Sequence, residues 1–107
     1  MEAAADDLRI AENPAQRRYE AHLGADLAGY SEYRLVPGRV IFTHTVVEPR
    51  FEGRGIASRL VRHELDESRQ RGLKVIPRCP FVRAFISRHA DYQDLLSAPL
   101  EPAATDG

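Results

Sequence analysis

The sequence predicts a mixed α+β domain in which three antiparallel strands precede a long helix, a further strand and a final helix. Three observations lead to this prediction. Apolar and polar residues alternate within residues 16–47, a period that suits half-buried strands. From residue 56 the apolar residues recur with a spacing of four, as on one face of a helix. Short turns separate the first three segments, which favours an antiparallel meander.

The three strands are predicted from this alternation and from the turn residues between them. Residues 16–24 form the first strand, and a turn at residues 24–26 leads to the second strand, at residues 27–36. A Pro-Gly turn then leads to the third strand, residues 39–47, which is rich in β-branched residues. The side chains expected on the buried face of the first strand are Tyr19, Ala21 and Leu23.

The long helix is predicted to begin near Ile56 and to run for about four turns. Gly72 stands where a helix C-terminal glycine is expected. Residues 73–77 read as a short apolar strand, and the spacing i, i+3, i+4, i+7 from Val82 to His89 predicts a second helix after Pro80. The apolar stripe of the long helix consists of Ile56, Ala57, Leu60, Val61 and Leu65.

The length of 107 residues leaves room for one domain. We expect an ordered core at about residues 8–96, preceded by a loose acidic segment at residues 1–7. The tail at residues 97–107 is rich in Pro, Ala and small polar residues, so we expect it to be disordered.

Charge and composition narrow the function classes. The net charge of −1 gives no general attraction to nucleic acid or to an anionic membrane, so neither partner is expected. No apolar run approaches the ~20 residues that span a bilayer, and the N-terminus lacks the pattern of a secretory signal. A cytoplasmic location is therefore expected. The lone cysteine and the histidine spacing match no zinc pattern, so no metal is predicted.

Two glycines, Gly53 and Gly55, lie where the third strand gives way to the long helix. The first N–H groups of a helix lack partners and carry a partial positive charge, so a glycine turn before them can hold an anion. The spacing alone leaves open whether the glycines serve only a tight turn. The Walker phosphate pattern fails because Ile56 follows Gly55, and the dinucleotide fingerprint fails because Ser58 replaces its third glycine.

A third pattern fits. The hexapeptide Arg50-Phe51-Glu52-Gly53-Arg54-Gly55 matches Gln/Arg-x-x-Gly-x-Gly/Ala at every fixed position, and it resembles the acetyl-CoA signature of the GCN5-related N-acetyltransferases. The resemblance covers roughly residues 16–96 and is greatest to the very small, single-domain YjdJ-type group. That group reads His-Thr-Glu-Val before the glycines and Pro-x-Cys-Pro after the next strand. The corresponding residues are His44-Thr45-Val46-Val47 and Pro77-Arg78-Cys79-Pro80.

The resemblance implies a fold in which the third strand splays from residues 73–77 and leaves a gap for the thioester and pantetheine of acetyl-CoA. Backbone groups near Val46 and Val47 would hydrogen-bond the pantetheine. It also implies an amine acceptor, either a small molecule or a protein, whose identity the sequence does not give. The N–H groups implied to hold the cofactor's pyrophosphate are those of Gly53, Arg54, Gly55, Ile56 and Ala57.

Two residues are candidates for catalysis. Cys79 lies beside Arg78 and before a predicted helix, and both neighbours favour a thiolate. The alternative is a small buried hydrophobe. The resemblance places Cys79 close to the thioester and implies a role in acyl transfer or in lining the cofactor site. His44 is a candidate base, or a strand histidine packed under a helix.

Two departures from the family pattern bear on catalysis. Val46 replaces a strand carboxylate that could act as a base, and Phe85 stands where many acetyltransferases have a tyrosine acid. Tyr92 could replace that acid only if the C-terminal segment folds back over the site. The resemblance as a whole implies an acetyl-CoA-dependent N-acetyltransferase. The alternative is an acyl-CoA-binding module with little or no catalytic activity.

Overall fold

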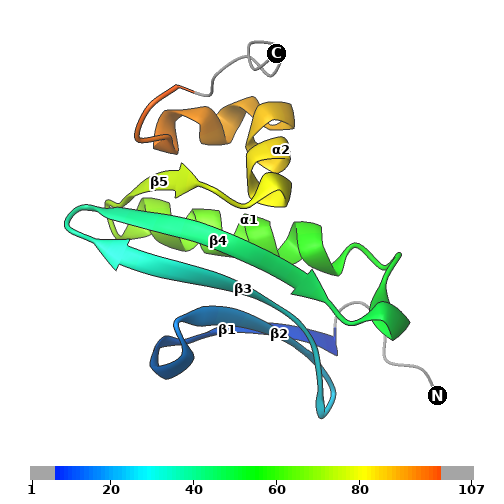
Figure 1. Ribbon diagram of the computed structural model, residues 1–107. Coiled ribbons are helices and arrows are strands. Elements are labelled where there is room, and N and C mark those ends of the chain that lie inside the picture. The colour runs from blue at the N-terminus through cyan, green and yellow to red at the C-terminus, as the bar shows by residue number, and fades with distance from the viewer. Residues whose placement is uncertain (1–6, 100–107) are drawn as a thin grey trace.

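The structure, a computed structural model, describes residues 7–99, and in them one five-stranded sheet carries the fold (Figure 1). The spatial order of the strands follows the chain. The first four strands form an antiparallel meander, and the fifth pairs parallel to the fourth. The strands are β1 (Leu8–Asn13), β2 (Arg18–Leu23), β3 (Asp26–Val36), β4 (Arg39–Val47) and β5 (Lys74–Pro77).

Two α-helices complete the fold and confirm the predicted mixed α+β class. The long helix α1 (Ile56–Gln70) crosses one face of the sheet, while α2 (Pro80–Arg88) lies beyond β5 (Figure 1). Within residues 7–99, three short 3₁₀ helices connect or follow these elements: η2 (Pro14–Gln16), η3 (Pro49–Phe51) and η4 (Ala90–Leu95).

The meander contains four strands rather than the three that were predicted. The additional strand, β1, pairs with β2 from Leu8 opposite Leu23 to Asn13 opposite Arg18. Only two apolar residues, Leu8 and Ile10, alternate within it, which is too short a pattern to stand out in a single sequence. The other strands agree with the predicted ranges, and β4 has the predicted bounds.

The long helix packs as its sequence predicts. Ile56, Leu60, Val61 and Leu65 are buried against the sheet. The helix ends in a Schellman motif, because the Leu73 amide donates to the Ser68 carbonyl at 2.9 Å and the Gly72 amide donates to the Arg69 carbonyl at 3.1 Å. Gly72 has a φ of +69°, which confirms its predicted role as the C-terminal glycine.

A β-bulge divides β4 into two halves. Glu32 of β3 pairs with His44, but the next β3 residue, Tyr33, pairs with Phe42, so Thr43 is an extra residue on β4. An extra residue reverses the alternation of faces beyond it. Phe42 therefore faces the core before the bulge, and Thr45 faces it after the bulge, while His44 is exposed.

The strands β4 and β5 part after a short parallel ladder, as the resemblance implies. Their pairing ends at Phe42 opposite Pro77, and the Cys79 amide then donates to the Phe42 carbonyl at 2.8 Å. The later residues of β4, up to Val47, pair only with β3. Beyond Phe42 the second edge of β4 therefore has no strand partner, and the space between the diverging strands is called the gap below.

The described chain continues into the predicted tail. The Ser97 amide donates to the Val75 carbonyl at 2.9 Å, and Leu96 forms an isolated parallel bridge with Val75, so residue 97 is attached to the edge of β5. Because this hydrogen bond fixes its backbone, Ser97 departs from the predicted disorder. The rest of the tail from residue 100, and residues 1–6, lie outside the described residues.

Candidate functional site

The loop between β4 and α1 combines left-handed glycines with open space. Gly53 and Gly55 have φ angles of +82° and +75°, and a Cβ at either position would meet no heavy atom within 4 Å. Residues other than glycine are destabilised by about 1–2 kcal/mol in this conformation. The backbone conformation therefore favours glycine at both positions, although no neighbouring atom crowds them. The open space lies over the loop backbone and leaves room for a ligand to approach it.

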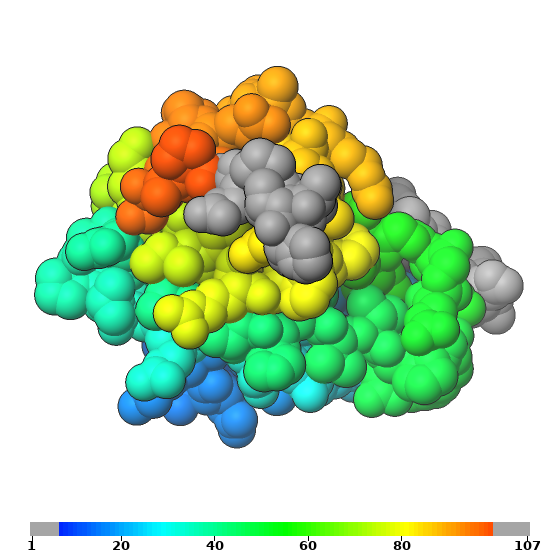
Figure 2. All heavy atoms as spheres, turned by 45° about the horizontal axis from the view of Figure 1, so that its top comes forward, coloured from blue at the N-terminus to red at the C-terminus, as the bar shows by residue number. Residues whose placement is uncertain are grey.

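The backbone N–H groups at the N-terminus of α1 have no hydrogen-bond partners among the described residues. Gly55 is its N-cap and provides no side-chain cap, and the first turn carries no acidic residue. Within the described residues, no hydrogen bond is made by the N–H groups from Gly53 to Ser58. Unpaired N–H groups at a helix N-terminus attract anions. In the space-filling view this loop, in green, forms an outer edge of the face that carries α2 (Figure 2).

Two arginines border this loop through a shared aromatic ring. Phe51 is buried, and the guanidinium groups of Arg50 and Arg54 lie 4.6 Å and 5.4 Å from its ring centre. Arg50 also lies 3.5 Å from a carboxylate oxygen of Asp26. Cation–π contact holds both positive charges beside the free N–H groups, which strengthens the attraction for an anion.

The gap beside β4 begins next to this loop. Val47 packs against the core, whereas Val46 is 38% exposed, as expected for alternate residues of a strand. Gly29 of β3 lies so close that a Cβ there would be 2.7 Å from the Val46 carbonyl oxygen. Glycine at this position therefore allows the backbone of Val46 and Val47 to take the path that borders the gap.

Cys79 lies at the closed end of the gap, where β5 passes into α2. It is the N-cap of α2 and is only 3% exposed. Its Sγ lies 3.3 Å from the Thr45 hydroxyl, which lies 3.4 Å from the buried Ser31 hydroxyl. The bulge at Thr43 is what turns Thr45 toward the sulfur. The thiol thus lies at the end of a row of hydroxyl groups that crosses from β3 to β4.

A buried carboxyl group that sequence reasoning missed lies near this row. Glu64, on the sheet-facing side of α1, is fully buried. Burial raises the pKa of Glu64 well above that of an ordinary carboxyl, and the charge of Cys79 adds to the rise. Ser31 is close enough to oppose the shift, yet neither Glu64 oxygen has a partner with hydrogen-bond geometry. Its spacing of four from Leu60, inside the apolar stripe, was the available signal.

The structure places His44 away from Cys79. Its side chain is 71% exposed on the outer face of β4, 3.7 Å from Glu32. It is therefore not packed under a helix, and as a base it would act from the outer face.

The C-terminal segment folds back onto α1. The Tyr92 hydroxyl donates to Asp66 at 2.7 Å and accepts from Arg62 at 3.5 Å. Burial and the Asp66 carboxylate raise the pKa of Tyr92. Phe85 is buried and stacks on His89 with ring centres 3.9 Å apart. Asp66 therefore holds the Tyr92 hydroxyl on α1.

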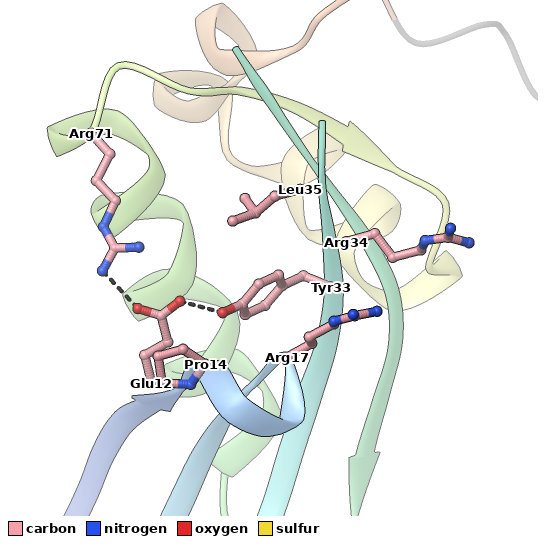
Figure 3. A pocket seen from close by; sticks show the side chains of 7 residues that line it. All are labelled: Glu12, Pro14, Arg17, Tyr33, Arg34, Leu35 and Arg71. Carbon is pink, nitrogen blue, oxygen red and sulfur yellow. Dashed lines mark hydrogen bonds and ion pairs between the residues drawn. The ribbon is translucent and has the colours of Figure 1, made fainter. Parts of the chain in front are cut away.

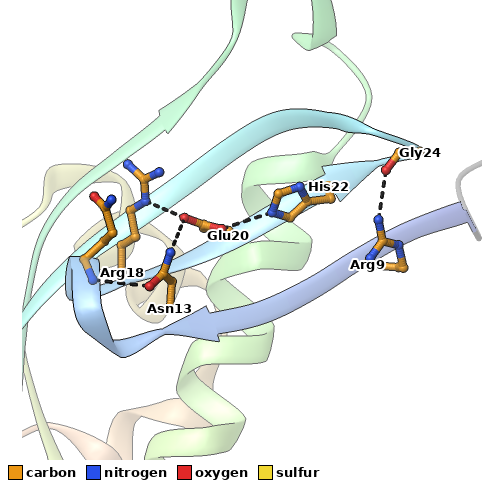
Figure 4. A network of polar contacts seen from close by, with 7 residues as sticks. Arg9, Asn13, Arg18, Glu20, His22 and Gly24 are labelled. Carbon is orange, nitrogen blue, oxygen red and sulfur yellow. Dashed lines mark hydrogen bonds and ion pairs between the residues drawn. The ribbon is translucent and has the colours of Figure 1, made fainter.

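Two further groups of polar residues lie toward β1 and β2. The Glu20 carboxylate accepts hydrogen bonds from Asn13, Arg18 and His22 at 2.7–3.0 Å (Figure 4). Burial opposes its ionisation, but the three donors outweigh that effect and hold the pKa of Glu20 at about 2. The Glu20 carboxylate is therefore satisfied by hydrogen bonds within the protein.

A hollow near the end of α1 contains a second carboxylate that is paired within the protein. Its carboxylate, Glu12, accepts from the Tyr33 hydroxyl and from Arg71, which donates at 2.7 Å (Figure 3). Arg17 and Arg34 line the same hollow but point away from Glu12 (Figure 3). The Glu12 carboxylate is therefore satisfied by Tyr33 and Arg71 within the protein.

The chain belongs to the GCN5-related N-acetyltransferase family, since the family's model matches residues 18–95, about three quarters of the sequence. The matched region contains both the glycine loop and Cys79. No curated protein matches the chain.

A comparison of structures shows the same fold. The NMR solution structure of a Staphylococcus aureus protein described as GCN5-like superimposes with a TM-score of 0.68 at 24% sequence identity. The match covers 89% of this chain and 92% of that chain. The two proteins are therefore nearly equal in extent.

The described residues contain neither a metal-binding cluster nor a membrane-spanning helix. They gather no three His, Cys, Asp or Glu side chains in an arrangement able to hold a metal ion. None of their helices has the length and apolar content needed to cross a bilayer.

Proposed function

We propose that this protein binds acetyl-CoA along the gap between β4 and β5 and transfers the acetyl group to an amine. The observation that carries the proposal is the position of the loop at Gly53 and Gly55. Its unpaired N–H groups lie beside the unpaired edge of β4, which leads to Cys79. Family membership supports acyl transfer, and the loop supports CoA as the acyl carrier.

The residues present fit the phosphate part of CoA. The N–H groups of Gly53, Arg54 and Gly55, continued by Ile56 and Ala57, would hold the pyrophosphate, and the open space above the glycines admits it. Arg50 and Arg54 would add positive charge. A backbone site of this kind depends on glycine conformation more than on side-chain identity.

The residues along β4 fit the extended part of CoA. The free edge near Val46 and Val47 offers backbone groups that an extended pantetheine arm can pair with, in the manner of an added strand. The thioester of bound acetyl-CoA supplies the activated acetyl group.

We assign proton transfer to the thiol of Cys79, which lies at the closed end of the gap. Amide formation at the thioester carbon releases a thiolate, which needs a proton. The Cys79 thiol is placed to give up that proton, and the Thr45 hydroxyl 3.3 Å away stabilises the sulfur that remains. The candidate base His44 lies on the outer face of β4, away from Cys79, so we assign the deprotonation of the amine to water or to a second amine.

The test combines a binding measurement with a turnover measurement. Calorimetry with CoA and acetyl-CoA is expected to show one site per chain, and a thiol-release assay over a panel of amines is expected to show turnover. The Cys79→Ala variant is expected to keep its affinity and to lose about tenfold or more in kcat. Binding without turnover on any amine would instead identify an acyl-CoA-binding module, and absence of binding would reject both functions.

A further inference from the structure

Glu64 has an ionisable carboxyl group in the buried core, where such groups are rare. It lies on α1 between Leu60 and Leu65, both fully buried, and neither of its carboxyl oxygens has a hydrogen-bond partner. Leaving such a group unpaired in the interior is destabilising. A methionine or leucine would fill the space without this cost, so the presence of a carboxyl needs an explanation outside packing.

The groups around Glu64 indicate what it can do. Ser31 of β3 and Cys79, at the start of α2, both act on its carboxyl. Burial raises the pKa of Tyr19 of β2, and Glu64 contributes to the rise. No cationic side chain in the part of the chain described contributes to its ionisation. Because burial favours the uncharged form, it raises the pKa of Glu64, and the protonated carboxyl can donate a hydrogen bond.

A row of hydroxyl groups leads from this acid to the thiol. Ser31 Oγ lies 3.4 Å from Thr45 Oγ1, and Thr45 Oγ1 lies 3.3 Å from Cys79 Sγ. Each hydroxyl has one proton to donate and lone pairs to accept with. If Glu64 donates to Ser31, then Ser31 can donate to Thr45 and Thr45 to the sulfur. Every donor then points toward Cys79.

We propose that Glu64 is a positioning residue for Cys79: its carboxyl O–H orients the hydroxyls of Ser31 and Thr45 so that the row donates to the Cys79 sulfur and stabilises the thiolate. The sequence of donors is Glu64, Ser31, Thr45, Cys79. The proposal requires Glu64, whose carboxyl oxygens are unpaired in this structure, to donate to Ser31 when the sulfur becomes negative. Hydrogen bonds to the charged form of a group favour that form, and bonds in a row strengthen one another.

This inference rests on the proposed function, in which Cys79 gives up its proton at the thioester. It supplies a reason for a carboxyl on α1 in a chain whose β4 carries Val46 at the gap edge and whose α2 carries Phe85. Glu64 touches neither cofactor nor acceptor in this scheme. Its effect passes through Ser31 and Thr45.

The experiment uses the fact that Cys79 is the chain's lone cysteine. Thiolate formation is followed by ultraviolet absorbance against pH in the free protein, with Cys79→Ser as the baseline. Glu64→Met keeps the volume and removes the donor, so its thiolate midpoint is expected about one pH unit above wild type. Glu64→Gln keeps a donor N–H and is expected within about 0.3 unit of wild type.

Two further variants interrupt the row at other points. Thr45→Val and Ser31→Ala are expected to raise the midpoint in the same direction as Glu64→Met. The double variant Glu64→Met, Thr45→Val is expected to shift no further than Thr45→Val alone, because both act through one row. Circular dichroism verifies each fold, and if Glu64→Met does not fold, Ser31→Ala and Thr45→Val together with Glu64→Gln carry the test.

The proposal is overturned if Glu64→Met titrates like wild type, or if Glu64→Gln shifts as far as Glu64→Met. It is also overturned if the two single shifts simply add in the double variant. None of these measurements requires acetyl-CoA. A failed N-acetyltransferase assay with the expected midpoints would therefore reject the proposed function alone, and unchanged midpoints with normal turnover would reject the role of Glu64 alone.

Discussion

The two edges of the sheet differ in whether their polar groups have partners within the protein. Toward β1 and β2, Glu20 has three donors and Glu12 has two, so these carboxylates are satisfied within the protein. Toward β4 and β5, the loop at Gly53 and Gly55 has unpaired N–H groups, the edge of β4 is free, and Glu64 has no partner. The first side is built for stability, and the second leaves donors and an acid available for a ligand and for chemistry.

The largest expected effect is on the open side. Gly55→Val is expected to weaken CoA binding at least 100-fold, about 2.7 kcal/mol or more, because a branched side chain disfavours φ of +75° and occupies the ligand's approach. Calorimetry with CoA measures the loss. Gly38→Val is the matched control, since Gly38 has φ of +72° and equally open space but lies in the β3–β4 turn. Equal losses of affinity in both variants would remove the loop from the CoA site.

The next effect tests the satisfied side. Glu20→Gln is expected to lower the free energy of unfolding by about 2–3 kcal/mol at neutral pH, because its pKa of about 2 in the folded state lies below the ordinary carboxyl value of 4.5. A depressed folded pKa gives stability that is present above pH 4.5 and is lost as the pH falls toward 2. Urea unfolding of both proteins should therefore converge near pH 2. A difference that persists there would mean that the carboxylate charge is not the cause.

A smaller effect is expected at Gly29, where close packing sets the path of β4 beside the site. Gly29→Ala is expected to lower the free energy of unfolding by about 2 kcal/mol and to weaken CoA binding about tenfold, because its Cβ would press on the Val46 carbonyl and move the edge of β4. Denaturant unfolding and CoA titration measure the two effects. Gly24→Ala, which strains a turn with open space around it, is expected to lose stability without losing affinity. Unchanged affinity in Gly29→Ala would show that the path of β4 does not matter for CoA.

The smallest expected effect has the opposite sign. Glu64→Met is expected to raise the free energy of unfolding by about 1–2 kcal/mol, because it replaces an unpaired buried acid by an apolar side chain of similar volume. Thermal and urea unfolding measure the gain. Together with Glu20→Gln, this variant contrasts the two glutamates directly. A loss of stability in Glu64→Met would show that the carboxyl is held by contacts as Glu20 is.

The fold was predictable because its strongest signals are long or specific. The stripe from Ile56 to Leu65 spans several turns of α1, and the glycine hexapeptide fixes the strand-to-helix turn. The strand β1 escaped prediction because its burial depends on pairing with β2. A strand with two alternating apolar residues carries little local signal.

The candidate site was predictable only in part, for two physical reasons. Backbone sites follow from glycine spacing, so the loop could be located from the sequence. The surroundings of Cys79 depend on a bulge at Thr43, and one extra residue in a strand leaves no mark in the composition or period of β4. Glu64 lay inside a pattern interpreted only for its apolar members, so a polar residue on that face was overlooked.

Before the bulge the even-numbered residues of β4 face the core, and after the bulge the odd-numbered residues do. Residues before it contribute Val40 and Phe42 to the core, and residues after it present Thr45 and Val47 inward. A regular ladder that kept Thr43 as a paired residue, without the bulge, would therefore invert every side chain beyond it. His44 and Val46 would turn toward α1, and the hydroxyl next to Cys79 would face solvent.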